Sequence, residues 1–329
     1  MFVEQSALPK LAAIREAQQL LGKYFSPTPL VKAASLSTNS SEVFLKNETV
    51  LPTNSFKPRG AIYSLTKNLQ RGKVDEIVAS STGNHGAAVA YAAKTLGIKA
   101  TIFLPENPNP VKRKKIENLG ARTVCNGSID LAGASQAASE YAKRPGVYFL
   151  NDATDLDLPA GPATIGLEIL EQLPNVSAVY VPMGDTALIR GIGAAIKRVS
   201  AKTRMIGVQA EQAPSYALSW RAGKQIATKT CDTIADGLAT RTPEAENVAG
   251  IREVVDDVVL VSEEQMIEAI GRLYVGEKVL AEPSGAAATA GFLAKPESGR
   301  VVLVVSGGNI SPEIRERAGI PTGVISGES

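Results

Sequence analysis

One lysine, Lys57, stands between an aromatic residue and a proline in the stretch Ser-Phe-Lys-Pro-Arg-Gly-Ala at residues 55–61. We expect Ser55 to cap a helix that carries Pro58 in its first turn, where the missing proline N–H costs nothing. The positive end of the helix dipole would then lower the pKa of Lys57. A neutral lysine amine attacks carbonyl groups and forms Schiff bases. The alternative is a solvated surface lysine, which is the ordinary state of lysine.

Three further stretches, residues 81–86, 184–187 and 306–309, combine small and polar residues where a strand is expected to end. In open parallel sheets, ligands bind at the carboxyl ends of the strands. Residues 81–86 read Ser-Thr-Gly-Asn-His-Gly and precede a predicted helix. The backbone N–H groups at such a helix N-terminus suit a carboxylate ligand.

The elements that must position these stretches alternate between strands and helices, in two blocks separated near residues 150–159. The predicted strands are residues 43–46, 77–80, 100–104, 121–125, 178–181, 205–209, 257–261 and 300–305. The predicted helices are residues 6–21, 60–69, 84–96, 111–119, 128–143, 163–173, 189–201 and 263–276. This alternation favours parallel sheets with helices on both faces. The unbroken apolar run at residues 300–305 is typical of a central strand.

The lysine stretch resembles the lysine motif of the threonine/serine dehydratase and serine racemase family, whose members are pyridoxal-phosphate enzymes of fold type II. Residues 81–86 and 306–309 also match, and residues 233–237 and 282–286 support them. The resemblance runs from about Pro27 to Pro312. It implies an α/β protein with two doubly wound open-sheet domains. Residues 50–149 would form a small substrate-side domain, inserted in a large cofactor-binding domain of residues 1–49 and 150–329.

The resemblance implies pyridoxal 5'-phosphate as the cofactor and gives roles to particular residues. Lys57 would be the Schiff-base lysine and proton acceptor, and Thr82 occupies the position of a second acid/base in serine racemase. The implied cofactor-binding residues are Phe56, Lys57, Asn84, Gly184, Asp185, Thr186, Ala187, Leu188, Glu282 and Ser306. The implied substrate-binding residues are Ser81, Thr82, Gly83, Asn84 and His85. His85 is the only histidine, and we favour a structural role for it because the family's chemistry uses the lysine and the cofactor phosphate.

Two of these residues have implied chemical consequences. Asn84 would hydrogen-bond the 3' oxygen of the cofactor. Ser306 would face the pyridine nitrogen and leave it largely neutral, whereas an aspartate would keep it protonated. A short-lived carbanion then favours loss of a β-substituent over transamination.

The sharpest departure from the family pattern is the phosphate loop, which usually consists of four glycines and reads Gly-Asp-Thr-Ala at residues 184–187. Thr186 would add a hydroxyl donor. Asp185 would be repelled by a phosphate, so we expect it to turn away or to pair with a cation such as Arg190. The alternative is a plain turn that binds no phosphate.

A divalent-metal site of serine racemase and related dehydratases is not expected here. Its two carboxylate ligands fall at Gln209 and Ser215, and hard divalent cations prefer charged oxygen ligands. A monovalent cation remains open.

Composition excludes several other classes of protein. The chain has 329 residues and a formal net charge of +2, so neither a nucleic-acid nor a membrane partner is expected. Two cysteines are too few for a disulfide framework. The charged residues among residues 1–21 argue against a signal peptide. We therefore expect a cytoplasmic protein, and a homodimer.

The favoured function is a lyase that removes the β-hydroxyl group and ammonia from a 3-hydroxy amino acid and yields a 2-oxo acid. L-Threonine and L-serine are the default substrates, and the altered phosphate loop leaves a specialised 3-hydroxy amino acid open. The alternatives are a serine racemase-like enzyme that uses Thr82, a β-replacement enzyme, and a non-catalytic binding protein, which only Asp185 favours.

Overall fold

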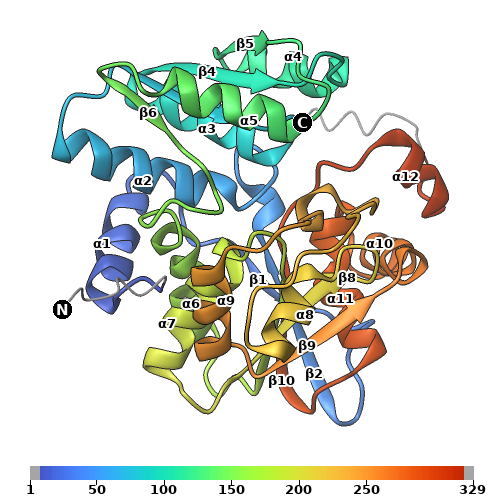
Figure 1. Cartoon of the computed structure of the whole chain (residues 1–329). Helices are drawn as coiled ribbons and strands as arrows, with labels where there is room; N and C mark the ends of the chain where they lie inside the picture. The colour runs from blue at the N-terminus through green and yellow to red at the C-terminus, as the bar shows by residue number, and fades with distance from the viewer. Residues whose placement is uncertain (1–7, 322–329) are drawn as a thin grey trace, which may run out of the picture.

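Two separate sheets form the framework of the computed structural model, which describes residues 8–321. The larger sheet has the strand order β1 (Leu30–Lys32), β2 (Ser41–Asn47), β10 (Gly299–Val305), β7 (Ala178–Pro182), β8 (Arg204–Ala210) and β9 (Asp257–Val261). The smaller sheet has the order β5 (Arg122–Cys125), β4 (Lys99–Leu104), β3 (Glu76–Ser80) and β6 (Val147–Phe149). In Figure 1 the smaller sheet lies above the larger one.

All strand pairs are parallel except the pair of β1 and β2. Strand β10 pairs with both β2 and β7, and its residues from Val301 to Val305 are completely buried. Val301 and Leu303 belong to one apolar core, and Val302 and Val304 to another. Because successive side chains point to opposite faces, this one strand holds both halves of the large lobe together.

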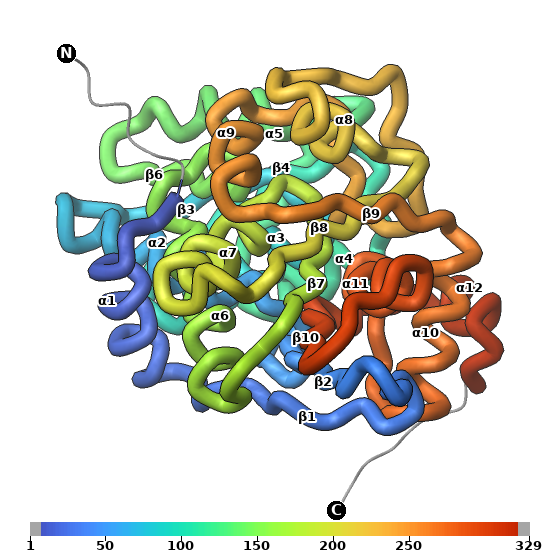
Figure 2. The backbone as a smooth tube through the Cα atoms, turned by 90° about the horizontal axis from the view of Figure 1, so that it is seen from below, coloured from blue at the N-terminus to red at the C-terminus, as the bar shows by residue number. Residues whose placement is uncertain are grey.

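Helices cover both faces of each sheet. They are α1 (Leu11–Leu21), α2 (Lys57–Arg71), α3 (Asn84–Leu96), α4 (Pro110–Asn118), α5 (Leu131–Tyr141), α6 (Ala160–Gln172), α7 (Ala187–Val199), α8 (Ser215–Ala222), α9 (Ala245–Val254), α10 (Glu263–Glu277), α11 (Pro283–Ala294) and α12 (Pro312–Arg317). The view from below shows α6 and α7 on one side of β10 and β7, and α10 and α11 on the other (Figure 2). The short 3-10 helices are Glu48–Val50 and Asp236–Leu238.

The predicted elements agree with the observed ones to within a few residues, with local corrections. Helix α1 begins at Leu11, later than predicted, because Pro9 keeps Leu8 out of helical geometry; residues 6–7 lie outside the described part of the chain. Helix α3 has the predicted bounds and ends at Gly97, whose φ of 72° favours glycine. Strands β1 and β6 and helices α8, α9, α11 and α12 were not predicted. The domain bounds at residues 49/50 and 149/150 stay a prediction.

Two further observations, on the cysteines and on membrane-spanning helices, apply to residues 8–321. Cys125 and Cys231 are free thiols. Between residues 8 and 321, the structure contains no helix that is both long and apolar enough to cross a membrane.

Candidate active site

Lys57 is the first residue of helix α2, and the start of this helix is bonded to the end of strand β10. The backbone N–H of Phe56 donates to the carbonyl of Ser306 at 3.0 Å, and Ser55 forms an antiparallel bridge with Gly307. The prediction that Ser55 caps α2 is therefore wrong. Phe56 occupies the cap position without a side-chain hydrogen bond, while Pro58 lies in the first turn as expected.

The amine of Lys57 contacts a carboxylate that the sequence did not single out. Asp152 Oδ2 lies 2.5 Å from Lys57 Nζ, and the two side chains are only 19% and 21% exposed. Burial lowers the pKa of Lys57, but the attraction of Asp152 outweighs it, so the pKa lies above its usual value. The expectation of a lowered pKa is therefore wrong for the free amine. Asp152 follows strand β6, and the missed strand explains the missed residue.

A buried network of charges fixes the first turn of α2. The Arg59 guanidinium binds Glu48 at 2.8 Å and Glu168 at 2.5 Å, and Lys46 donates to Glu168 at 2.6 Å. All four side chains are at most 7% exposed. The two positive and two negative charges balance, and Thr28 and Thr164 add hydrogen bonds. The network joins the helix of Lys57 to α6 and to the end of β2.

Asn84 links the small lobe to the large one. Its Nδ2 donates to Glu282 Oε1 at 2.6 Å, and its Oδ1 accepts from Asn309 Nδ2 at 2.6 Å. Asn309 Oδ1 in turn accepts from Lys115 Nζ at 2.5 Å. Residues from three of the predicted motifs therefore lie in one hydrogen-bonded chain.

The loop at residues 184–188 leads from β7 into the N-terminus of α7. A side chain at position 184 would place its Cβ 2.0 Å from the carbonyl oxygen of Gly237, so only glycine is tolerated there. Thr186 has a φ of 70°, a backbone conformation that non-glycine residues rarely adopt. Its hydroxyl accepts a hydrogen bond from Arg190 Nε at 3.1 Å.

Asp185 turns toward Thr240, whose hydroxyl donates to Asp185 Oδ1 at 2.9 Å. The carboxylate is thus hydrogen-bonded by Thr240, whereas the sequence led us to expect that it turns away from the phosphate or pairs with a cation such as Arg190. Burial and the nearby Asp152 raise the pKa of Asp185 to about 6, although Lys57, Thr240 and Arg190 oppose this rise.

The loop at residues 81–83 is half-buried and leads into α3. Ser81 Oγ accepts from the N–H of Gly83 at 3.1 Å. His85 is buried, its Nε2 lies 3.0 Å from the carbonyl of Leu150, and its Nδ1 lies 3.7 Å from Asp152. Burial lowers the pKa of His85. These contacts agree with a structural role for this histidine.

The positions that correspond to metal ligands have other partners. Gln209 Oε1 accepts from the N–H of Ala217 at 2.8 Å, and Ser215 Oγ donates to the carbonyl of Thr240 at 2.5 Å. Within residues 8–321 no group of three or more His, Cys, Asp or Glu side chains could hold a metal ion.

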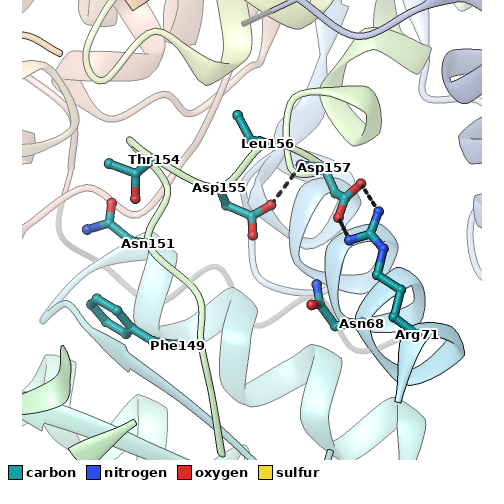
Figure 3. A pocket seen from close by; sticks show the side chains of 8 residues that line it. All are labelled: Asn68, Arg71, Phe149, Asn151, Thr154, Asp155, Leu156 and Asp157. Carbon is teal, nitrogen blue, oxygen red and sulfur yellow. Dashed lines mark hydrogen bonds and ion pairs between the residues drawn. The ribbon is translucent and has the colours of Figure 1, made fainter. Parts of the chain in front are cut away.

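A surface pocket of about 300 Å³ lies beside the segment that carries Asp152, but it is lined by residues of α2 and residues 149–157 that have no predicted role. In Figure 3, Arg71 and Asp157 of this pocket point toward each other. The pocket therefore does not mark the site around Lys57.

Comparison with known proteins shows to which family the chain belongs. Residues 22–307 match the pyridoxal-phosphate dependent enzyme family. The chain belongs to this family. L-Threonine ammonia-lyase of Thermotoga maritima is 37% identical over 310 residues, which are 93% of this chain and 77% of that protein. The structure of maize serine racemase has a TM-score of 0.87 at 29% identity, and covers 94% of this chain and 97% of its own. The processed form of threonine deaminase isoform 2 from Solanum lycopersicum has a TM-score of 0.86 at 26% identity, with 97% and 96% covered.

The predicted fold class, an α/β protein of pyridoxal-phosphate fold type II, is confirmed, and so is the cofactor of the family. The residues present suit this cofactor. Lys57 offers an amine for its aldehyde, and the first N–H groups of the 13-residue helix α7 have no acceptor within the helix. Such a terminus binds phosphate. Asp185 does not prevent this, because its carboxylate is held by Thr240.

Asp185→Gly is expected to leave the affinity for pyridoxal phosphate equal or better, since it removes a carboxylate from the loop that faces a dianion. Thr186→Ala is expected to weaken the affinity by about 1 kcal/mol, the low end of the contribution of one hydrogen bond to a charged group. Cofactor titration followed by visible absorbance measures both. If Asp185→Gly abolishes binding, the carboxylate positions the loop and our interpretation of it is wrong.

Glu282→Gln is expected to stabilise the cofactor-free protein at pH 8 by at most about 3 kcal/mol. Burial raises the pKa of Glu282 to about 7 from 4.5, although the hydrogen bond from Asn84 opposes this rise. The folded protein thus keeps a proton that the unfolded chain has released, and this stability, full below pH 4.5, is lost as the pH rises to about 7. Glutamine cannot ionise, so the variant avoids the loss.

Urea unfolding at pH 5 and pH 8 tests this prediction. The difference between variant and wild type should grow with pH, whereas Glu253→Gln, at an exposed position on α9, should show no such growth. A constant difference at both pH values would contradict a raised pKa.

Proposed function

We propose that the chain is a pyridoxal-phosphate-dependent ammonia-lyase that removes the β-hydroxyl group and ammonia from a 3-hydroxy amino acid and releases a 2-oxo acid. The observation that carries the proposal is the half-buried amine of Lys57, which lies at the start of α2, is bonded through Phe56 to the end of β10, and contacts Asp152. The relative from Thermotoga maritima, named L-threonine ammonia-lyase, supports L-threonine and L-serine as substrates.

When bound, pyridoxal phosphate supplies an aldehyde that joins to amines and a ring that stabilises negative charge at the substrate Cα. The chain's own residues do the rest. Lys57 binds the cofactor and takes the Cα proton. The N-terminus of α7 and Thr186 hold the phosphate, and Asn84 orients the ring. The N-terminus of α3, with residues 81–85, holds the substrate carboxylate.

Ser306 favours elimination over transamination. It lies buried directly after β10 and would offer a neutral hydroxyl to the ring nitrogen of the bound cofactor. A carboxylate there would keep the nitrogen protonated and prolong the life of the negative charge at Cα. With a hydroxyl, prompt loss of the β-substituent is the favoured outcome.

The experiment is an assay of 2-oxo acid formation with a panel of 3-hydroxy amino acids that includes L-threonine, L-serine and aryl-serines. We expect turnover that depends on added cofactor. The absence of 2-oxo acid with every member of the panel would overturn the proposal.

A racemase is the second candidate, because the side chain of Thr82 makes no hydrogen bond within residues 8–321 and leaves its hydroxyl available in the loop before α3. Maize serine racemase has a closely similar fold. Chiral analysis of serine recovered from the same assay separates the two activities, since only a racemase produces the D-isomer. The homodimer and the cytoplasmic location stay predictions.

A further inference from the structure

The carboxylate of Asp152 is placed to control the proton on Lys57. It lies 2.5 Å from Nζ, in direct contact with the amine and in position to accept a charge-assisted hydrogen bond from it, and both groups are largely removed from water. Asp152 lies in the segment after strand β6, and Lys57 is the first residue of helix α2, about 95 positions earlier in the sequence. The contact therefore joins two elements that the chain brings together only in the folded protein.

The other ionisable groups around this amine are held by other partners. Asp185 accepts from Thr240, and Glu282 accepts from Asn84, so both act on Lys57 only through their charge. His85 faces Asp152 across 3.7 Å, and its other ring nitrogen is engaged by the carbonyl of Leu150. Asp152 is the carboxylate in direct contact with the amine.

We propose that Asp152 is a catalytic partner of Lys57: it strengthens the amine as a base by stabilising the ammonium that forms when Lys57 takes the proton from the substrate Cα. This inference rests on the proposed function. In the step, the Cα–H bond breaks, its electron pair stays on Cα, and the new N–H bond of Lys57 lies against Asp152 Oδ2. The carboxylate itself stays ionised. The role parallels that of a buried aspartate which holds a protonated histidine in hydrolases.

The same contact has an opposite effect on the attachment of the cofactor. Only a neutral amine attacks an aldehyde, and Asp152 holds Lys57 as an ammonium. Removing the charge should therefore speed the attachment of pyridoxal phosphate and slow the removal of the Cα proton. A merely structural role would not produce these opposite changes, because a distorted site would slow both steps.

The test compares wild type with Asp152→Asn, which keeps the size and removes the charge, and with Asp152→Glu, which restores a carboxylate. The first measurement is the rate at which pyridoxal phosphate joins the cofactor-free protein, followed by visible absorbance from pH 6 to 9. We expect Asp152→Asn to shift the pH midpoint down by about one unit or more, and to react about tenfold faster at pH 7.

The second measurement is loss of the Cα proton of L-serine in D2O, followed by NMR with enzyme loaded with cofactor. We expect Asp152→Asn to slow this step by about 10- to 100-fold, the effect of losing one charge-assisted hydrogen bond, and Asp152→Glu to recover part of the rate. Asp157→Asn is the matched control, because Asp157 lies in the same segment and pairs with Arg71 at the surface. It should behave as wild type in both measurements.

Two results would overturn the proposal: a slowing of both steps in Asp152→Asn, which indicates a structural residue, or no change in either step. Circular dichroism and urea unfolding of each variant exclude a folding defect as the cause. The attachment rate needs no substrate, and Cα proton loss needs no elimination. If wild type makes no 2-oxo acid, the proposed lyase activity fails while these measurements still decide the role of Asp152.

Discussion

Lys57→Ala is expected to abolish elimination and leave a folded protein. The change removes the amine that holds the cofactor and takes the Cα proton, and general acid–base catalysis alone contributes up to about 10⁴-fold. We therefore expect kcat/KM to fall by at least about 1,000-fold. The variant should also lose the visible absorption of lysine-bound cofactor, which is measured on the same samples.

Lys67→Ala serves as the control for this variant. Lys67 lies on the same helix and pairs with Glu16 at 2.8 Å, away from the site. It should keep both the absorption and the activity. Turnover near the wild-type rate in Lys57→Ala would show that another group performs both tasks.

Arg59→Met is expected to destabilise the protein by about 3–5 kcal/mol, because it leaves the carboxylates of Glu48 and Glu168 buried with only Lys46 as a counter-charge. Methionine retains most of the apolar stem, so the measured loss reports mainly on the charge. Urea unfolding measures it through the midpoint and the slope.

Arg71→Met is the matched control on the same helix. Arg71 pairs with Asp157, but its side chain is 57% exposed, and exposed pairs contribute about 1 kcal/mol or less. Equal losses in the two variants would contradict a special contribution of the buried network.

The sequence predicted the sheets, the helix ends and the positions of the loops correctly where a local residue pattern is enough to determine them. The alternation of apolar strands and helices indicated parallel sheets, and Gly97 marked the end of α3 because a left-handed residue closes a helix. The loops of Asn84 and Ser306 were placed at the carboxyl ends of strands by the same logic, and the structure brings the start of α2 to the end of β10.

The predictions for the site are wrong or incomplete where contacts between residues far apart in the sequence determine the charge and the pKa of a group. The helix end carries about half a positive charge, whereas Asp152 places a full negative charge 2.5 Å from Lys57 Nζ. The larger and closer charge determines the sign of the pKa shift. Strand β6 has only three residues, too few for a clear period, so the sequence did not reveal Asp152.

The buried network of charges around Arg59 was not predicted from the sequence, for a related reason. Lys46, Glu48 and Glu168 are of types that are almost always exposed unless paired. Glu168 pairs with both Arg59 and Lys46, each more than 100 positions away in the sequence, and no local pattern records such a separation.

The bond between the start of α2 and the end of β10 also bears on the order in which the protein is made. Lys57 leaves the ribosome long before Ser306 and Gly307, to which its neighbours Phe56 and Ser55 are joined. A nascent chain that stops before residue 299 therefore carries the reactive lysine without the strand that anchors it. We therefore expect the chain to become able to hold the cofactor only after β10 has been made, and chains that end before this strand should not sequester it.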